Sequence, residues 1–339
     1  MGHAVVGRNR LQVDFSGKSG MYGSTNRPEF SHIEGYEDHS VNLLYTWDKE
    51  DNLTGVVINL ACPSQVSESK YYISADFWHD TRMELRKRLG KNIFILPQAS
   101  PSGDQSPHIM VGEEAEARMQ KIMFPDMEAG RGSLGRRKQI AMDISDAVTS
   151  VLPYMKDKIE WNPVFEHHME VVKLSRRLIS IKDVNDALQE AKELEKQYGQ
   201  LMAEIEANPA IKEENKRWYV KVNGLYRGIK RGYSVKYRYL LEKKQPEMLV
   251  EIHVLRIGDI IIATNPFELY LDYGMRIKAR SPARQTFLVH LTGSGSYLPT
   301  TRSAAGGAYG GVPASTLTGP EGGQELVEET LKLINELME

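Results

Sequence analysis

Residues able to attack a substrate, donate protons or bind metal stand in loops that directly follow apolar strand patterns. In residues 91–107 (KNIFILPQASPSGDQSP), the apolar run 92–96 leads into a loop of small residues that carries Asp104 and Ser106. Such a short run is typical of a strand buried on both faces, and Pro, Gly and Ser in the loop let the backbone approach a ligand closely. We therefore interpret Ser106 as a candidate catalytic hydroxyl. An ordinary connecting turn is the alternative, because Asp and Ser favour turns for local reasons.

Three further loops, 61–64, 265–268 and 292–311, share this position after an apolar strand pattern. Parallel strands of an open α/β sheet place such loops along one carboxyl edge, where ligands bind. We therefore expect one site, assembled from Cys62, Asp104, Ser106, Glu268, Tyr297 and Tyr309. Each residue also has a purely structural explanation. Cys62 suits a buried apolar position, Glu268 suits the first turn of a helix, and both tyrosines suit loop packing.

The elements that would position these loops follow from periodicity and turn signals. Apolar runs at Ser40–Trp47 and 54–61 predict a hairpin, and a helix over 76–88 followed by the strand 92–96 predicts a parallel strand–helix–strand unit. Further helices are expected at 113–122, 135–152, 163–178, 183–207, 267–279 and 324–338. Further strands are expected at 217–222, 233–241, 248–257, 259–264 and 286–291. The pattern predicts an α/β (mixed α+β) fold of layered mixed sheets flanked by helices.

The chain is expected to form a single domain, 1–339, with a helical-hairpin insertion at about 155–215. Residues 183–207 repeat apolar positions at alternating steps of four and three. We favour packing of this seam against the neighbouring helix of the same chain, and a homo-oligomer contact through 183–207 is the alternative. The run 226–239, YRGIKRGYSVKYRY, interleaves basic and aromatic residues that could serve RNA or lipid headgroups. The period of two in Tyr233–Tyr239 instead indicates a strand with one charged outer face.

Composition excludes several classes of function. With 41% hydrophobic residues, 339 residues suffice for a real core, while a net charge of −2 disfavours polyanion binding. Cys62 is the only cysteine, so no internal disulfide forms, and no apolar run reaches membrane-spanning length. The sequence starts abruptly with MGHAVVGRNR, so we expect residues upstream of Met1 to be missing. The sequence does not specify a cellular compartment. No phosphate-binding glycine motif is present, which disfavours nucleotide binding, and the His-Glu-x-x-His pattern of metalloproteases is also absent.

Several segments together resemble the catalytic domain of neutral/alkaline non-lysosomal ceramidases. In chain order they are VVINLACPSQ, GDQSP, IIIATNPFELYLDYGMRIKARSP, SYLPTT and the tripeptide 308–310. The resemblance implies a zinc-dependent amidase that cleaves the N-acyl bond of a ceramide. It implies that Ser106 is the active-site serine, that Glu268 and Tyr297 are zinc ligands, and that Tyr309 helps to hold the amide. Arg10 resembles the arginine of the family's Asn-Arg-Ser-Pro segment and would stabilise an oxyanion.

Two departures from the family pattern affect the metal site. Cys62 stands where the family has a zinc-binding histidine, and the family's upstream His-x-His segment has no counterpart here. Thiolate binds zinc well, but Cys62, Glu268 and Tyr297 would leave three protein ligands and no evident general base. The family's C-terminal immunoglobulin-like domain is also missing from this sequence, and members of the family are often exported.

Three functions follow from these observations. The leading hypothesis is a ceramidase-like amidohydrolase with Zn²⁺, in which Ser106, Arg10, Tyr309 and Asp104 form the catalytic group and the substrate is a lipid or related amide. The second is a binding or structural homologue with an incomplete metal site. The third is a metal-free serine hydrolase that uses Ser106, with His108 as the one histidine placed beside it.

Overall fold

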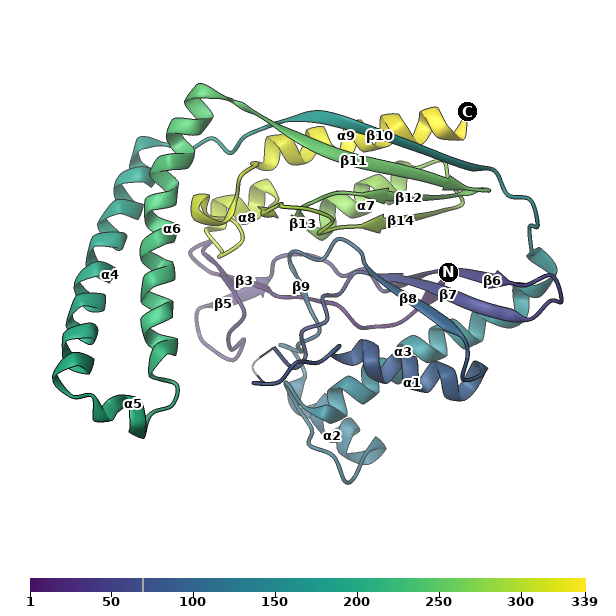
Figure 1. Ribbon diagram of the computed structural model, residues 1–339, viewed down its shortest axis with the longest axis horizontal. Helices are drawn as coiled ribbons and strands as arrows, with labels where there is room; N and C mark the ends of the chain where they lie inside the picture. Colours follow the sequence, from purple (N-terminus) through teal and green to yellow (C-terminus); the bar gives the residue numbers. More distant parts are fainter. Residues whose placement is uncertain (69) are drawn as a thin grey trace.

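Two four-stranded β-sheets meet where the edge strand of the second sheet contacts the first, and helices pack on one face of each sheet (Figure 1). The computed structural model describes residues 1–68 and 70–339. A pair of long helices projects from one end of the sheets as an arm. The mixed α/β class and the layered arrangement predicted from the sequence are confirmed.

The first sheet has the strand order β1-β6-β7-β8. Its strands are β1 Gly2–His3, β6 Ser40–Trp47, β7 Leu53–Leu60 and β8 Phe94–Ala99. The predicted β6–β7 hairpin is antiparallel, and α1 (Phe77–Leu89) connects β7 to β8 in parallel, which confirms the strand–helix–strand unit. Apolar side chains of α1 and α3 (Leu134–Val151) pack against this sheet and bury its outer face.

The second sheet has the order β10-β11-β12-β14. Its strands are β10 Phe165–Ser175, β11 Glu247–Ile257, β12 Ile260–Thr264 and β14 Gln285–Val289. β12 and β14 are parallel and joined by α7 (Leu271–Arg280). The C-terminal helix α9 (Pro320–Met338) lies beside α7, and both contribute to a second apolar core.

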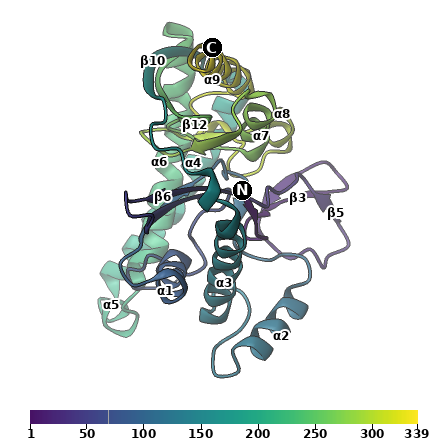
Figure 2. The ribbon, with the colours of Figure 1, turned by 90° about the vertical axis from the view of Figure 1, so that its right-hand side faces the viewer.

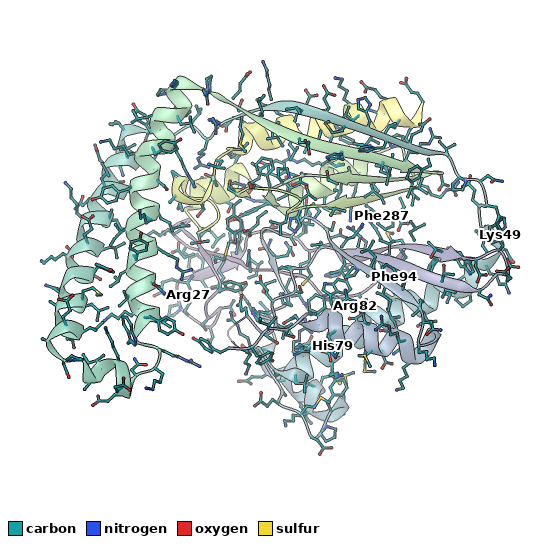
Figure 3. All side chains as sticks on the ribbon, viewed as in Figure 1. Arg27, Lys49, His79, Arg82, Phe94 and Phe287 are labelled. Carbon is teal, nitrogen blue, oxygen red and sulfur yellow. The ribbon has the colours of Figure 1, made fainter. Side chains whose placement is uncertain are left out.

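β14 is the last strand of its sheet, so one of its edges lacks a strand partner. The carbonyl oxygens of Thr286 and Leu288 instead accept hydrogen bonds from the side-chain amides of Asn42 (2.8 Å) and Asn59 (2.7 Å) in the first sheet. Phe287 is fully buried, and side chains fill the space between the sheets around it (Figure 3). The two sheets are therefore held together by polar as well as apolar contacts.

The arm is a helical hairpin of α4 (Ile181–Ala207) and α6 (Trp218–Lys244), joined through the short helix α5 (Ala210–Glu214). Helix α4 begins with a capping box in which Ser180 and Asp183 exchange side-chain to backbone hydrogen bonds. The α4 seam faces α6 of the same chain, because a Cβ added to Gly232 would come within 2.7 Å of the Ala187 carbonyl and 2.8 Å of the Ala191 side chain. The contact within the chain thus uses the predicted seam. Self-association through 183–207 stays a prediction.

Two regions differ from the sequence prediction. Residues 163–178 do not form a helix, because β10 pairs with β11 in unbroken register from Phe165↔Ile257 to Ser175↔Glu247. The predicted strands 217–222 and 233–241 are also wrong, since Arg217 is the N-cap of α6 and the other residues lie within this helix. Packing against α4 stabilises this segment as a helix, and this tertiary contact outweighs the local period of two. The helical hairpin accordingly spans 181–244 rather than about 155–215, and the single-domain division stays a prediction.

Short strand pairs and turns lie between the sheets and the arm. Figure 2 shows the small sheet β4-β3-β5 standing at one side of the molecule. The remaining short elements are β2 Arg8–Asn9, β3 Leu11–Asp14, β4 Ser19–Met21, β5 Phe30–Ile33, β9 Gln105–Ser106, β13 Glu268–Leu269, β15 Tyr297–Leu298, α2 Glu113–Met123 and α8 Thr301–Gly306. Single 3₁₀ turns lie at Leu152–Tyr154, Lys156–Lys158 and Pro313–Ser315.

Candidate active site

The loops that follow β8, β12 and β14 meet at one place. Glu268 and Tyr297 are register partners in the β13–β15 pair, and the Gly103 amide donates to the Leu269 carbonyl at 2.8 Å. A Cβ on Gly103 would come within 2.4 Å of the Glu268 carbonyl oxygen, so the close approach requires glycine at this position. The loops thus lie together although their strands belong to two sheets rather than to one.

Ser106 lies at the centre of this region and is fully buried. Its strand β9 pairs with β2, where Arg8 is its register partner. The Ser106 hydroxyl oxygen accepts hydrogen bonds from the Tyr22 hydroxyl at 3.4 Å and from the His108 backbone amide at 3.1 Å. The serine is therefore held in place and connected to a phenol.

Arg10 connects Ser106 to the strand pair β13–β15. One guanidinium nitrogen, Nη1, donates to the Tyr22 hydroxyl at 2.8 Å, and Nη2 donates to the Gly103 carbonyl at 2.8 Å and to the Tyr297 hydroxyl at 3.3 Å. Burial alone would lower the pKa of Arg10, but Tyr22, Tyr297 and Glu268 hold it above its ordinary value. A permanent positive charge is thus buried here, and Tyr22 connects it by hydrogen bonds to the Ser106 hydroxyl.

Tyr297 remains a neutral phenol in this environment. Burial raises its pKa, and the hydrogen-bonded Glu268 carboxylate raises it further, against the opposing effect of Arg10. The Tyr297 ring meets Tyr309 edge to face, with centroids 5.9 Å apart. Tyr309 is half exposed, and its hydroxyl accepts a hydrogen bond from Arg231 of the arm at 3.0 Å. Tyr309 therefore lies at the solvent side of the cluster.

Asp104 organises the backbone around the serine. One of its carboxylate oxygens accepts from the Leu271 amide at 2.8 Å, and the other accepts from the Asn9 side chain at 3.1 Å. Burial raises the pKa of Asp104 to about 6, although these hydrogen bonds oppose the shift. Both carboxylate oxygens already have protein partners, so Asp104 positions β2, β9 and the start of α7 relative to one another.

Cys62 lies apart from the predicted metal ligands. It belongs to the apolar core of the first sheet, whereas Tyr297 packs against the core of the second. Burial strongly raises the pKa of the Cys62 thiol, and its Sγ donates to the neighbouring Pro63 carbonyl at 3.4 Å. Zinc binds the thiolate rather than the thiol. Across residues 1–68 and 70–339, no three His, Cys, Asp or Glu side chains stand close enough to hold a metal ion. The predicted ligands Cys62, Glu268 and Tyr297 therefore do not form one metal site, because Cys62 lies in a different core from Tyr297.

Two functional candidates escaped the sequence analysis, Tyr22 and Glu68, the partner of His108. Tyr22 has a positive φ of 66° and receives a further hydrogen bond from Gln65. His108 Nε2 lies 2.9 Å from a Glu68 carboxylate oxygen, and the imidazole meets the Tyr22 ring edge to face at 5.9 Å. Tyr22, Gln65 and Glu68 lie in irregular segments, where periodicity gives no signal.

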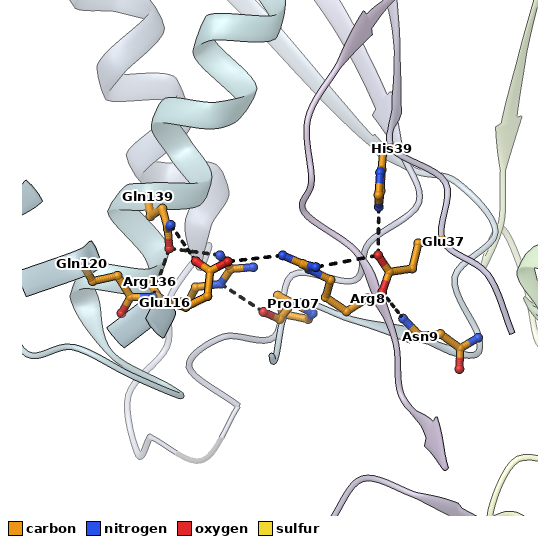
Figure 4. A network of polar contacts seen from close by, with 9 residues as sticks. All are labelled: Arg8, Asn9, Glu37, His39, Pro107, Glu116, Gln120, Arg136 and Gln139. Atoms are coloured by element: carbon orange, nitrogen blue, oxygen red, sulfur yellow. Dashed lines mark hydrogen bonds and ion pairs between the residues drawn. The ribbon is translucent and has the colours of Figure 1, made fainter. Parts of the chain in front are cut away.

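Figure 4 shows how helices α2 and α3 support this region. Arg136 of α3 donates from Nε to the Pro107 carbonyl at 3.2 Å. Glu116 of α2 accepts from Gln139 at 3.0 Å and pairs with Arg8 of β2 at 3.5 Å. Pro107, which follows Ser106, and Arg8, its register partner, are thereby fixed to α3 and α2.

The same fold occurs in solved ceramidases. A neutral ceramidase from Pseudomonas aeruginosa superimposes with a TM-score of 0.59 at 14% sequence identity, over 99% of this chain and 51% of that one. A ceramidase complexed with C2 superimposes with a TM-score of 0.55 at 12% identity, over 98% of this chain and 52% of that one. No protein-family model and no curated protein matches the sequence. This chain, which spans about half the length of these ceramidases, therefore has a ceramidase-like fold.

Proposed function

We propose that the chain carries a ceramidase-like hydrolase site that cleaves the amide bond between an acyl group and an amine. The proposal rests on a series of side-chain hydrogen bonds that leads from Ser106 through Tyr22 and Arg10 to Tyr297. The likeness of fold to solved ceramidases supports the class of substrate. Glu268, the register partner of Tyr297, completes the group.

In this proposal the Ser106 oxygen forms a bond to the amide carbon, and the carbonyl oxygen takes up the negative charge. Arg10 supplies the positive charge for that oxygen, because it is buried and already oriented by Tyr22 and Gly103. Cleavage of the carbon–nitrogen bond then releases the amine, which takes a proton, and water hydrolyses the acyl–serine ester. Tyr309 borders the cluster and would contact the arriving amide.

The proton of Ser106 requires a base, and we assign this role to His108 with Glu68. Burial lowers the pKa of His108, while Glu68 opposes the shift, so the ring is neutral at neutral pH. A hydrogen bond from Nε2 to Glu68 leaves the Nδ1 lone pair free, and Nδ1 is buried without a protein partner. Charged groups facing this ring are Glu68, Arg131 and Asp76. His108 therefore has the protonation state that a general base needs.

Zinc stays a prediction from the family resemblance. Because the predicted ligands do not form one metal site, no step of the proposed reaction runs through a metal. The same observation favours a second candidate function, a non-catalytic homologue that binds a lipid amide without cleaving it.

Hydrolysis of N-acetylsphingosine by the purified chain tests the proposal, with released acetate as the readout. We expect turnover that Ser106→Ala lowers at least about 100-fold, since the nucleophile is lost. Ser100→Ala is the matched control, because Ser100 is equally buried at the end of β8 and its hydroxyl has no hydrogen-bond partner. Its activity should equal that of the wild type.

A complete lack of turnover in the wild-type chain, with and without added Zn²⁺, would reject the hydrolase. Retained binding of N-acetylsphingosine in that case would favour the non-catalytic homologue. Metal analysis of the active preparation decides the zinc prediction, because a bound stoichiometric zinc would contradict the metal-free steps described above.

A further inference from the structure

Exposed apolar side chains gather where the tip of the arm approaches the body of the molecule. Ile73 is completely exposed, and Tyr71 and Tyr72 before it are more than half exposed. Tyr219 and Val220, in the first turn of α6, are also exposed. We call these five residues the tip surface.

One contact joins the two segments of the tip surface. The guanidinium carbon of Arg217, directly before α6, lies 3.4 Å from the centroid of the Tyr71 ring. Such a cation–π contact fixes the loop against the arm. The five residues therefore form a shared surface rather than two unrelated exposed patches. In both Figure 1 and Figure 2, α5 and the arm's tip lie at one end of the molecule.

Basic residues flank the two segments of this surface in the sequence. Lys70, Lys212, Lys216 and Lys221 are exposed, and Lys216 pairs with Glu213 at 2.9 Å. Residues 212–244 contain 11 Lys and Arg against 3 Glu, although the whole chain has a net charge of −2. Because α4 holds 3 Lys against 7 Asp and Glu, the positive charge of the arm is concentrated on the α6 side.

We propose that the tip surface docks onto an anionic lipid bilayer. Aliphatic and tyrosine side chains flanked by lysines suit the boundary between headgroups and acyl chains, where the apolar parts insert and the ammonium groups contact lipid phosphates. Aliphatic Ile73 and Val220 offer nothing that a nucleic acid would recognise. None of the described helices is long and apolar enough to cross a bilayer, so attachment occurs at the surface.

The arm connects this docking surface rigidly to the candidate active site. Arg231 donates to Ser315 at 2.7 Å, and Arg238 donates to the carbonyls of Pro313 at 2.7 Å and Thr316 at 3.0 Å. The helical rise from Trp218 to Arg231 is about 20 Å. When the arm is docked, the length of α6 between Trp218 and Arg231 therefore sets the distance from the tip surface to the loop that carries Tyr309.

Co-sedimentation with vesicles tests the docking surface. The probes are phosphatidylcholine vesicles with and without 30% phosphatidylserine (about one lipid in three, enough to attract basic segments), at low and high salt. We expect the wild-type chain to bind the anionic vesicles and to lose most of that binding at high salt. Ile73→Asp should weaken binding at least about tenfold, because a carboxylate replaces the inserted side chain.

Ile181→Asp is the matched control. Ile181 is an exposed isoleucine at the first position of α4, at the opposite end of the arm, and an acidic residue is favourable there. Binding by this variant should equal that of the wild type, and thermal unfolding should show both variants to be folded.

Absence of wild-type binding to anionic vesicles, or equal loss in Ile73→Asp and Ile181→Asp, would overturn the proposal. So would a wild-type dimer in light scattering that Ile73→Asp converts to a monomer, because the tip surface would then contact a second copy. The vesicles contain no amide lipid, so the result is independent of hydrolysis. Ser106→Ala should bind them like the wild type.

Discussion

Two buried titratable residues near the candidate site shift stability with pH in opposite directions. Burial lowers the pKa of His290 to about 3, and its Nε2 lies 3.2 Å from the Ser102 hydroxyl. Burial raises the pKa of Asp104 to about 6. A buried neutral imidazole resists protonation, whereas a buried carboxyl resists ionisation.

The signs follow from proton binding in the folded and unfolded states. The folded pKa of His290 lies below its unfolded value of about 6.5, so its contribution is complete above that pH and is lost as pH falls. The folded pKa of Asp104 lies above its unfolded value of about 3.9, so its contribution is complete below that pH and is lost as pH rises through about 6.

Free energies of unfolding, measured by urea denaturation from pH 4 to pH 7, check this prediction. Relative to the wild type, His290→Gln should gain roughly 2 kcal/mol between pH 6.5 and pH 5. Asp104→Asn should instead lose up to about 3 kcal/mol relative to the wild type as pH falls from 6 to 4. Parallel pH profiles for wild type and variants would contradict both assignments.

How far the sequence predicts the site depends on where each residue lies. Ser106, Glu268 and Tyr297 follow recognisable strands, so their meeting was predictable from the order of loops. Tyr22 and Glu68 reach the cluster through irregular segments, whose paths depend on tertiary contacts. Cys62 follows a strand too, but its side chain points into the core, which the position of a loop does not reveal.

At the scale of elements, the close contact between α4 and α6 decides the shape of the arm. Gly232 of α6 faces Ala187 and Ala191 of α4. The alternation of tyrosines in 233–239 predicts a strand. In the structure, a buried stripe runs along a helix instead, formed by Val222, Ile229, Gly232 and Val235. That stripe becomes visible only when its partner helix is known.

Two glycine substitutions in α6 test this contact. Gly232→Ala should destabilise the arm by about 1–3 kcal/mol, because its Cβ would overlap backbone and side-chain atoms of α4. Gly224→Ala is the control, since a Cβ there meets no atom within 4 Å, and it should stabilise the helix by up to about 1 kcal/mol. Hydrogen exchange of the α4 and α6 amides measures both effects. Equal protection in the two variants would argue against the close contact.

At the scale of the whole molecule, the contact of β14 with the first sheet brings the site loops together. The sequence predicts the first strand–helix–strand unit, and the strands and helix of the second as separate elements, from local patterns. It gives no sign that they belong to separate sheets, because the inter-sheet hydrogen bonds join residues more than 200 positions apart.

Asn59→Leu tests the contribution of the hydrogen bonds between the two sheets. The substitution removes the donor to the Leu288 carbonyl and should lower the free energy of unfolding by about 1–3 kcal/mol, because a buried acceptor loses its partner. Asn223→Leu, at an exposed position of α6, should change it by less than about 0.5 kcal/mol. Thermal or urea unfolding measures the difference, and equal stability of both variants would contradict a structural role for Asn59.

The covered edge of β14 has a consequence for behaviour at high concentration. With that edge occupied by the asparagines, β10 is the terminal strand at which the second sheet could recruit a strand from another chain. β10 carries the exposed apolar residues Phe165, Met169 and Val171, interrupted by Glu166, Glu170 and Lys173. These charges act as gatekeepers against aggregation. Resistance to fibril-like assembly therefore has a different origin at each edge of the second sheet. The asparagines cover β14, and charged side chains protect β10.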